Sequence, residues 1–198
     1  LRAAGLSPAS AELPDRICRP FDLWRTTGVI GEGACMLVLE PDYSPRTGYA
    51  VISGYASATD SSSGVGTGMS QAIGTALANA KLDAGRVDLI NAWGPGHKEI
   101  DASEADALIR VFGDRIQSIP AFSVKGAIGN PFAAAGAIQV GLSALCILDE
   151  WVPPTVNWFT PDPDCPLCLS SNSRNAIINS VLINSHGLSG TNASLVVT

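Results

Sequence analysis

Charged residues are scarce in this sequence of 198 residues, at 15% of the chain, and no cluster of Lys and Arg is present. The 18 acidic residues outnumber the 12 basic ones, which gives a formal net charge of −6 and a pI near 4.7. A protein that neutralises a row of phosphates needs grouped positive charge. The composition therefore excludes nucleic acid as an expected partner.

Long apolar runs and a disulfide framework are also lacking. The longest apolar stretch, residues 133–148, is interrupted by Gln139 and is shorter than the roughly 18 residues that indicate a membrane span. We therefore expect a buried helix there and no membrane partner. The first ten residues contain no basic segment followed by an apolar one, so no secretory signal is expected.

Five scattered cysteines do not make a disulfide framework and indicate a reducing, cytoplasmic location.

Apolar residues make up 46% of the chain, and the mean hydropathy is +0.23. This balance supports a substantial core and argues against intrinsic disorder. A length of this order suits one mid-sized domain or a large piece of a bigger one.

Periodicity and turn residues predict an alternation of strands and helices. Asp101 and Glu104 are three residues apart, which is the spacing of a capping box and predicts that one of the helices begins there. We expect the first two strands to pair antiparallel across a Pro- and Gly-containing turn. This order predicts a layered α/β sheet. The expected strands span residues 29–40, 49–58, 87–92, 119–124, 176–184 and 193–197, and the expected helices span 69–82, 101–112 and 131–150.

Three local patterns carry weak chemical signals. The loop GVGTG at residues 64–68 precedes a helix, where amides attract anions, but Met69 stands where a third glycine would be needed for a dinucleotide-binding loop. Cys165 and Cys168 form a CxxC pair without a second pair, which favours two small loop residues over a zinc or redox site. The chain has two histidines, His97 and His186, and the second lies in a Gly-rich turn at a strand end, where side chains reach pocket mouths.

Five segments of the sequence form an ordered set of motifs. They are RPFD (19–22) with GEGA (31–34), NAWG (91–94) with Asp101 and Glu104, SVK (123–125) with GN (129–130) and AAG (134–136), VPPTVN (152–157), and NSHG (184–187) with GTNA (190–193). In this order they resemble the C-terminal half of β-ketoacyl synthases, the thiolase-fold condensing enzymes of fatty acid and polyketide synthesis. The resemblance extends from residue 19 to the C-terminus. It implies a thiolase-like layered α/β fold, with residues 1–48 as a lead-in and the last strand segment of the N-terminal half and residues 49–198 as the C-terminal domain.

The resemblance also implies an altered active site. The nucleophilic cysteine of the family lies in the N-terminal half, and none of the five cysteines here falls in a comparable motif. Two family histidines, which steady the enolate formed when malonyl thioesters lose carbon dioxide, correspond to Trp93 and Asn130. An indole N–H donates a hydrogen bond but cannot accept a proton.

Further site residues follow from the resemblance. Lys125 and Glu104 stand at positions that organise the site electrostatically, and inherited scaffolding, in which the two side chains pair to hold adjacent loops, is an equal alternative. His186, Gly187 and Leu188 correspond to a substrate-binding turn, with His186 in the place of a gating phenylalanine. No metal and no cofactor is expected.

The implied function is that of the C-terminal part of a β-ketoacyl-(acyl-carrier-protein) synthase-like protein that has lost condensation chemistry. Such a protein resembles the chain-length factors that pair with an active ketosynthase and shape its acyl tunnel. The expected partners are an N-terminal half or companion ketosynthase subunit, in a dimer or heteromer, and an acyl carrier protein. Two alternatives stay open: an active condensing enzyme or acyltransferase completed by an N-terminal half that carries the cysteine, and an unrelated α/β binding module.

Overall fold

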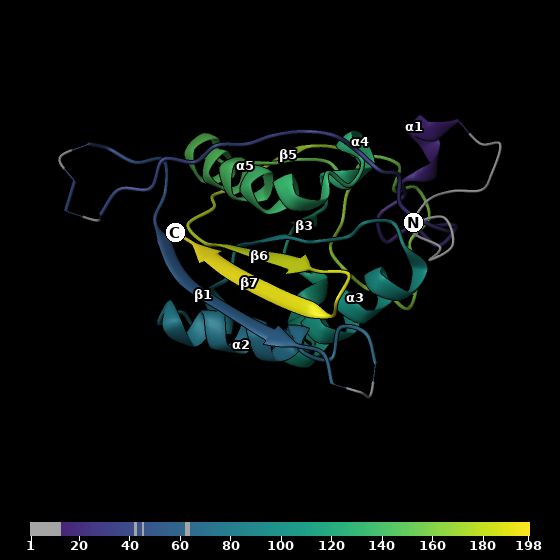
Figure 1. The fold of residues 1–198 in the computed structure, drawn as a ribbon, viewed down its shortest axis with the longest axis horizontal. Coiled ribbons are helices and arrows are strands. Elements are labelled where there is room, and N and C mark those ends of the chain that lie inside the picture. Colours follow the sequence, from purple (N-terminus) through teal and green to yellow (C-terminus); the bar gives the residue numbers. More distant parts are fainter. Residues whose placement is uncertain (1–12, 42, 45, 62–63) are drawn as a thin grey trace.

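A mixed five-stranded sheet forms the centre of the molecule (Figure 1). The computed structural model describes residues 13–41, 43–44, 46–61 and 64–198. The strands lie in the order β1 (Ile52–Thr59), β7 (Thr191–Val197), β6 (Val181–His186), β2 (Leu89–Asn91) and β3 (Ala121–Phe122). The β1–β7 and β7–β6 pairs are antiparallel, whereas β6–β2 and β2–β3 are parallel. The predicted layered α/β fold is confirmed.

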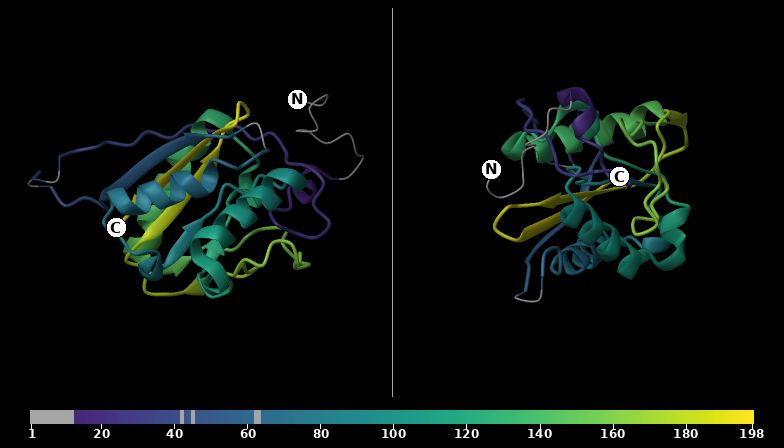
Figure 2. Two further views of the ribbon diagram at one scale, coloured as in Figure 1. Left: turned by 90° about the horizontal axis from the view of Figure 1, so that it is seen from below. Right: turned by 90° about the vertical axis from the view of Figure 1, so that its right-hand side faces the viewer.

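Helices cover both faces of this sheet (Figures 1 and 2). The helices α2 (Met69–Asn79) and α3 (Lys98–Phe112) pack on one face and enclose the larger apolar core, while α5 (Ala135–Asp149) packs on the other. The remaining elements are short: α1 (Pro14–Ile17), η2 (Ala84–Arg86), η3 (Gly113–Gln117), α4 (Lys125–Ile128), η4 (Phe132–Ala134), and a two-stranded sheet of β4 (Trp151–Val152) and β5 (Arg174–Asn175).

Helix α5 turns its polar side toward the sheet. Its buried residues are Ala135, Gln139, Ser143 and Cys146, whereas Leu145 and Leu148 are exposed. Gln139 and Ser143 bond to Asn91 of β2, with the Gln139 Nε2 to Asn91 Oδ1 distance at 3.2 Å and the Asn91 Nδ2 to Ser143 Oγ distance at 3.0 Å. The expectation of a buried helix over 133–148 is therefore wrong for most of its surface.

By length and composition alone, one stretch within the described residues, Phe132–Asp149, is apolar enough to cross a membrane, and 22% of it is buried. The core helix of a water-soluble protein passes the same test.

The expected strand over residues 29–40 is wrong. The segment runs extended past α5, and its isolated bridge joins Ile30 to Asn130. Met36, Val38 and Leu39 are exposed. In the described part of the chain, no strand pairs with this segment. The strand β1 pairs with β7 instead, so the antiparallel pair expected between residues 29–40 and 49–58 does not form.

The capping-box prediction is also wrong, because α3 begins at Lys98 with His97 as its N-cap. Asp101 and Glu104 lie inside the helix, fully buried, and bond to backbone amides of other segments. Other boundaries also differ. The largest differences are that β6 begins at Val181 rather than at residue 176 and that the long helix begins at Ala135, after the turn η4. The strands β2 and β3 are shorter than expected, and α2 ends at Asn79. The short elements α4, β4 and β5 were not predicted.

Candidate functional site

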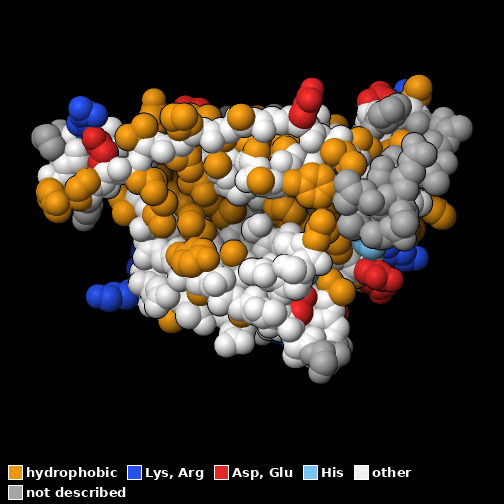
Figure 3. Space-filling model, in the orientation of Figure 1, with side chains coloured by type: hydrophobic (Ala, Val, Ile, Leu, Met, Phe, Trp, Pro, Cys, Tyr) orange, Lys and Arg blue, Asp and Glu red, His pale blue; other side chains and the backbone are white. Residues whose placement is uncertain are grey.

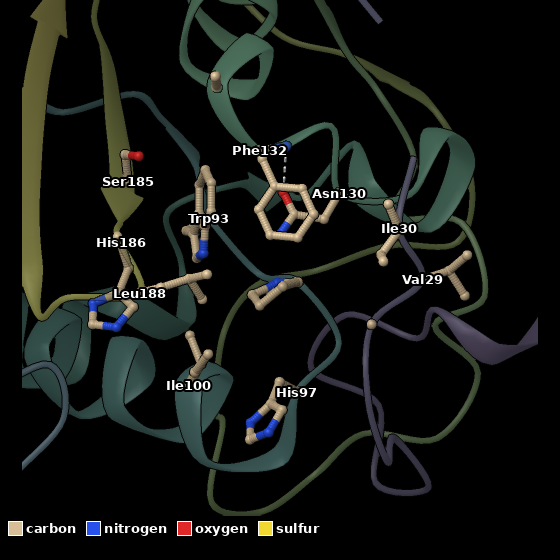
Figure 4. A pocket seen from close by; sticks show the side chains of 14 residues that line it. Val29, Ile30, Trp93, His97, Ile100, Asn130, Phe132, Ser185, His186 and Leu188 are labelled. Atoms are coloured by element: carbon tan, nitrogen blue, oxygen red, sulfur yellow. Dashed lines mark hydrogen bonds between the residues drawn. The ribbon is translucent and has the colours of Figure 1, made fainter. Parts of the chain in front are cut away.

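A cavity of about 290 Å³ lies where four loops meet (Figure 4). Residues 28–30, the loop that follows β2, the turn η4 and the β6–β7 turn line it. Predicted site residues from three of these loops come together at its wall: Trp93, Asn130, His186, Gly187 and Leu188. Lys125 and Glu104 do not line the cavity and lie behind Trp93.

Glu104 holds the backbone of the loop that carries Trp93. Its two carboxylate oxygens accept from the N–H groups of Trp93 and Gly94, both at 2.9 Å, and the amide of Asn184 donates to the same carboxylate at 3.1 Å. Gly94 has a φ of +35°, and a Cβ there would lie 2.5 Å from the ring of Phe21. The loop therefore requires glycine after Trp93, and the Glu104 carboxylate fixes the backbone conformation of the loop.

Lys125 also binds the backbone of the loop that carries Trp93. Its Nζ donates to the carbonyl oxygen of Trp93 at 2.5 Å and lies 3.7 Å from the centroid of the indole ring, within cation–π range. Burial lowers the pKa of Lys125 to about 7, although the nearby Glu104 carboxylate opposes the shift. Within the described residues no ion pair joins Lys125 to Glu104. The expected lysine–carboxylate pair is therefore replaced by two separate bonds to the Trp93 segment.

Trp93 and Asn130 both present N–H groups to the cavity. The Oδ1 atom of Asn130 accepts from the Phe132 N–H at 3.2 Å, which leaves its Nδ2 free to donate elsewhere. No described residue accepts from the indole N–H of Trp93. Figure 4 shows both side-chain nitrogens on the cavity side. This pair of neutral donors can bind a carbonyl oxygen, but neither group can take up a proton.

Cysteine is missing from the described wall of the cavity. The thiol of Cys18 donates to the Pro95 carbonyl at 3.4 Å, and burial raises its pKa to about 11. Burial likewise raises the pKa values of Cys146 and Cys165 to about 12. A thiol with so high a pKa has little thiolate at neutral pH, and the thiolate is the nucleophile.

The two weak motifs have structural explanations. The carboxylate of Asp60 accepts from the N–H groups of Gly66 and Gly68, at 2.8 and 3.0 Å, so the GVGTG loop binds an anion of its own chain. Cys165 packs beside Arg25, and Cys168 accepts from Arg174. Among the described residues no group of three or more potential ligands could hold a metal ion.

Sequence reasoning missed the role of Asp101 in joining the RPFD segment to α3. Its carboxylate accepts from the N–H groups of Phe21 at 2.8 Å and Gly96 at 3.1 Å, and it lies 3.6 Å from Arg25 Nε. Arg25 in turn pairs with Asp162. Burial raises the pKa of Asp101 to about 7, despite the opposing N–H group of Phe21 and charge of Arg25. His97 was also missed as a cavity residue, because its motif context resembled an ordinary loop.

Comparison with known proteins identifies the family. Residues 49–159 match the family model described as the C-terminal domain of β-ketoacyl synthases. The chain belongs to the β-ketoacyl synthase family. This β-ketoacyl synthase chain is 37% identical over 196 residues to a polyketide β-ketoacyl synthase 1 of Streptomyces virginiae, covering 94% of this chain and 47% of that protein. It is 35% identical to the 3-oxoacyl-[acyl-carrier-protein] synthase 2 of Coxiella burnetii, covering 93% and 47%.

Solved β-ketoacyl synthases share the fold. One is a type II polyketide synthase ketosynthase bound to a hexaketide, in complex with its acyl-carrier protein, with a TM-score of 0.91, 32% identity, and coverage of 98% of this chain and 50% of that chain. Another is the ishigamide ketosynthase/chain length factor, with a TM-score of 0.89, 31% identity, and coverage of 99% and 49%. The thiolase-type fold of a C-terminal half is confirmed. The chain spans about half the length of the curated β-ketoacyl synthases that it matches.

Proposed function

We propose that this chain is the C-terminal part of a β-ketoacyl synthase-like protein of fatty acid or polyketide biosynthesis that binds acyl groups without decarboxylating them. Its role is that of a chain-length factor, which shapes the acyl site of a companion. The observation that carries the proposal is the wall of the cavity, where the side chains at the two family histidine positions, Trp93 and Asn130, are neutral N–H donors.

The chemistry of these donors supports carbonyl binding over decarboxylation. Decarboxylation leaves an enolate with developing negative charge, and losing one donor that is aimed at this charge raises the barrier by about 3 to 4 kcal/mol. Trp93 is bulkier than an imidazole, and its ring is fixed against Lys125. It therefore fills space in which a second acyl unit would have to react.

The exposed side of α5 supports a companion subunit or half. Leu145 is 45% exposed and Leu148 57%, on a helix whose polar stripe faces the sheet. Apolar side chains of residues 36–39 extend this surface, and Figure 3 shows apolar atoms gathered over α5 and the hollow beneath it. An apolar face of this kind marks a protein interface. Because the chain matches only about half of its relatives, an N-terminal half is the occupant that we propose.

Two solved relatives support the kinds of partner. One was solved with an acyl-carrier protein, and the other is a ketosynthase/chain length factor. We therefore infer that this chain, with its companion, receives acyl groups from a carrier protein in the cytoplasm.

The test is to incubate the complete protein, with its companion, with malonyl carrier protein and to measure carbon dioxide release. We expect none above background. The double variant Trp93→His and Asn130→His is expected to gain decarboxylation, because imidazoles then replace the indole and the amide. Trp24→His is the matched control, because Trp24 is exposed and does not line the cavity. Decarboxylation by the unaltered complex at the rate of an active ketosynthase would refute the proposal.

The alternative is an acyltransferase whose cysteine comes from the companion. His186 at the cavity favours it, because an imidazole can exchange protons. Covalent loading of an acyl group, detected by intact mass, without carbon dioxide release would establish the transferase. Absence of both loading and release supports the non-catalytic role.

A further inference from the structure

Three polar side chains form a hydrogen-bonded row that ends at the cavity. Asp60, Asn192 and His186 lie at the ends of the adjacent strands β1, β7 and β6, and the register places His186 directly opposite Asn192. The Nδ1 atom of His186 lies 2.8 Å from Asn192 Oδ1, and Asn192 Nδ2 lies 2.5 Å from Asp60 Oδ1. His186 and Asn192 are both buried.

The partners of Asn192 determine which group donates in each hydrogen bond between Asp60, Asn192 and His186. Its Nδ2 faces the Asp60 carboxylate and the carbonyl oxygen of Gly190, at 3.3 Å, and both of these groups only accept hydrogen bonds. Burial alone would raise the pKa of Asp60, but the N–H groups of Gly68 and Gly66 and the Asn192 amide lower it, so the carboxylate is charged at neutral pH. Oδ1 of Asn192 must therefore face His186, and Nδ1 of the neutral imidazole must carry the proton.

The other ring nitrogen of His186 is then an acceptor. No described residue bonds to Nε2, and the imidazole lines the cavity beside Leu188 (Figure 4). The cavity thus combines donors on Trp93 and Asn130 with an acceptor on His186, and the hydrogen bond to Asn192 fixes which ring nitrogen is that acceptor. A fixed acceptor inside a largely apolar site rejects ligands that leave it unpaired.

We propose that Asp60 and Asn192 hold His186 as the Nδ1–H tautomer, so that Nε2 selects acyl ligands that carry a hydroxyl group. The ligand's carbonyl oxygen accepts from Trp93 or Asn130, and its hydroxyl donates to Nε2. Asp60 and Asn192 are positioning residues in this scheme, and His186 is the specificity-determining residue. The choice of acyl thioesters as ligands rests on the proposed function, whereas the tautomer does not.

The tautomer is tested by nitrogen NMR of the complete protein labelled with ¹⁵N-histidine. The two histidines give two sets of signals, so His97 is an internal control. We expect His186 Nε2 to show the shift of an unprotonated nitrogen and Nδ1 that of a protonated one. In Asp60→Asn the Asn192 amide loses its anionic acceptor and is free to turn over, so the Nε2–H form should rise while the His97 signals stay unchanged. A predominant Nε2–H form in the unaltered protein would overturn the proposal. The spectrum of the unaltered protein alone establishes the tautomer of His186, even if Asp60→Asn does not fold.

Ligand selection is tested with two acyl thioesters of equal length, β-hydroxyhexanoyl and hexanoyl N-acetylcysteamine. We expect the hydroxylated thioester to bind roughly tenfold more tightly, as one added hydrogen bond allows. His186→Phe, which keeps an aromatic ring, should abolish this preference, measured as the ratio of the two dissociation constants. Equal binding of the two thioesters by the unaltered protein would overturn the selection. Carbon dioxide release in the malonyl assay would refute the proposed function instead, without changing the tautomer spectrum.

Discussion

Lys125 places an amine with no exposed surface between the carbonyl oxygen and the ring of Trp93. Burial disfavours the charged form more than the Glu104 carboxylate favours it, and the pKa of Lys125 falls from 10.5 to about 7. In the unfolded chain the same amine is exposed to water and keeps its ordinary pKa. The folded state therefore binds fewer protons than the unfolded state between these two values.

Lys125 thus gives folding stability a pH dependence of definite sign. Because the unfolded state binds more protons, the contribution of Lys125 to the free energy of unfolding rises with pH between about 7 and 10.5, by up to about 1.4 kcal/mol per pH unit. The buried thiols of Cys18, Cys146 and Cys165 contribute with the opposite sign above about pH 9.0, because their pKa values are raised. We expect Lys125→Met to lose the lysine contribution, so that its stability rises less with pH than that of the unaltered protein. Urea unfolding at a series of pH values measures it, with Lys81→Met as the control because Lys81 is exposed. Equal slopes for the unaltered protein and Lys125→Met would contradict the assignment.

The site residues divide into those that motifs reveal and those that only the fold reveals. Trp93, Asn130 and His186 fall in motif positions, so their approach to one cavity followed from the resemblance. Asn192 lies in the GTNA segment, but its bond to Asp60 was not predicted, because that bond depends on the register of β1 and β7 across 132 residues of sequence. Local patterning carries no information about such a pairing.

At the level of elements, the packing of α2 on β1 depends on a missing side chain. A Cβ at Gly54 would lie 2.2 Å from the carbonyl oxygen of Ala76 and 2.7 Å from the backbone nitrogen of Ala80. These are backbone atoms of the helix end, so they cannot move aside without shifting α2. Gly74, on the exposed side of the same helix, has nothing within 4 Å of its Cβ position.

The two glycines therefore predict opposite effects of one substitution. Gly54→Ala should lower the free energy of unfolding by about 2 kcal/mol through overpacking. Gly74→Ala should raise it by about 0.5 to 1 kcal/mol, because alanine loses less entropy in a helix. Urea denaturation of both variants makes the comparison. A Gly54→Ala variant as stable as Gly74→Ala would show that β1 and α2 do not approach as closely as described.

An element could be predicted where its own residues carry the pattern of a helix or strand, and could not be predicted where it depends on contacts with residues distant in the sequence. The pattern of α2 is visible in its own residues, and its prediction differs only at the C-terminal end. Residues 29–40 have the composition of a strand but lack a neighbouring strand in the described chain. Asp101 and Glu104 have capping-box spacing, yet their carboxylates bind amides at Phe21 and Trp93, which a local pattern cannot anticipate.

For the whole molecule, the orientation of α5 is the feature that a single chain does not explain. A helix at the surface normally turns its apolar stripe inward and its polar residues to solvent. Here Gln139 and Ser143 face the sheet, and Leu145 and Leu148 face outward. The apolar composition of 133–148 predicts a buried helix, and the outer side of α5 would be buried only by a second layer, which the proposed companion would supply.

The companion can be tested on this surface. Leu145→Glu together with Leu148→Glu places two charges where we propose an apolar interface, and burying unpaired charge costs several kcal/mol. We expect the double variant to fold, because both side chains are exposed, but to lose the companion in size-exclusion chromatography and co-purification. Thr75→Glu is the control, because it adds charge to the exposed side of α2, on the opposite face of the sheet. Retention of the companion by the α5 variant at the level of Thr75→Glu would mean that α5 is covered by something else.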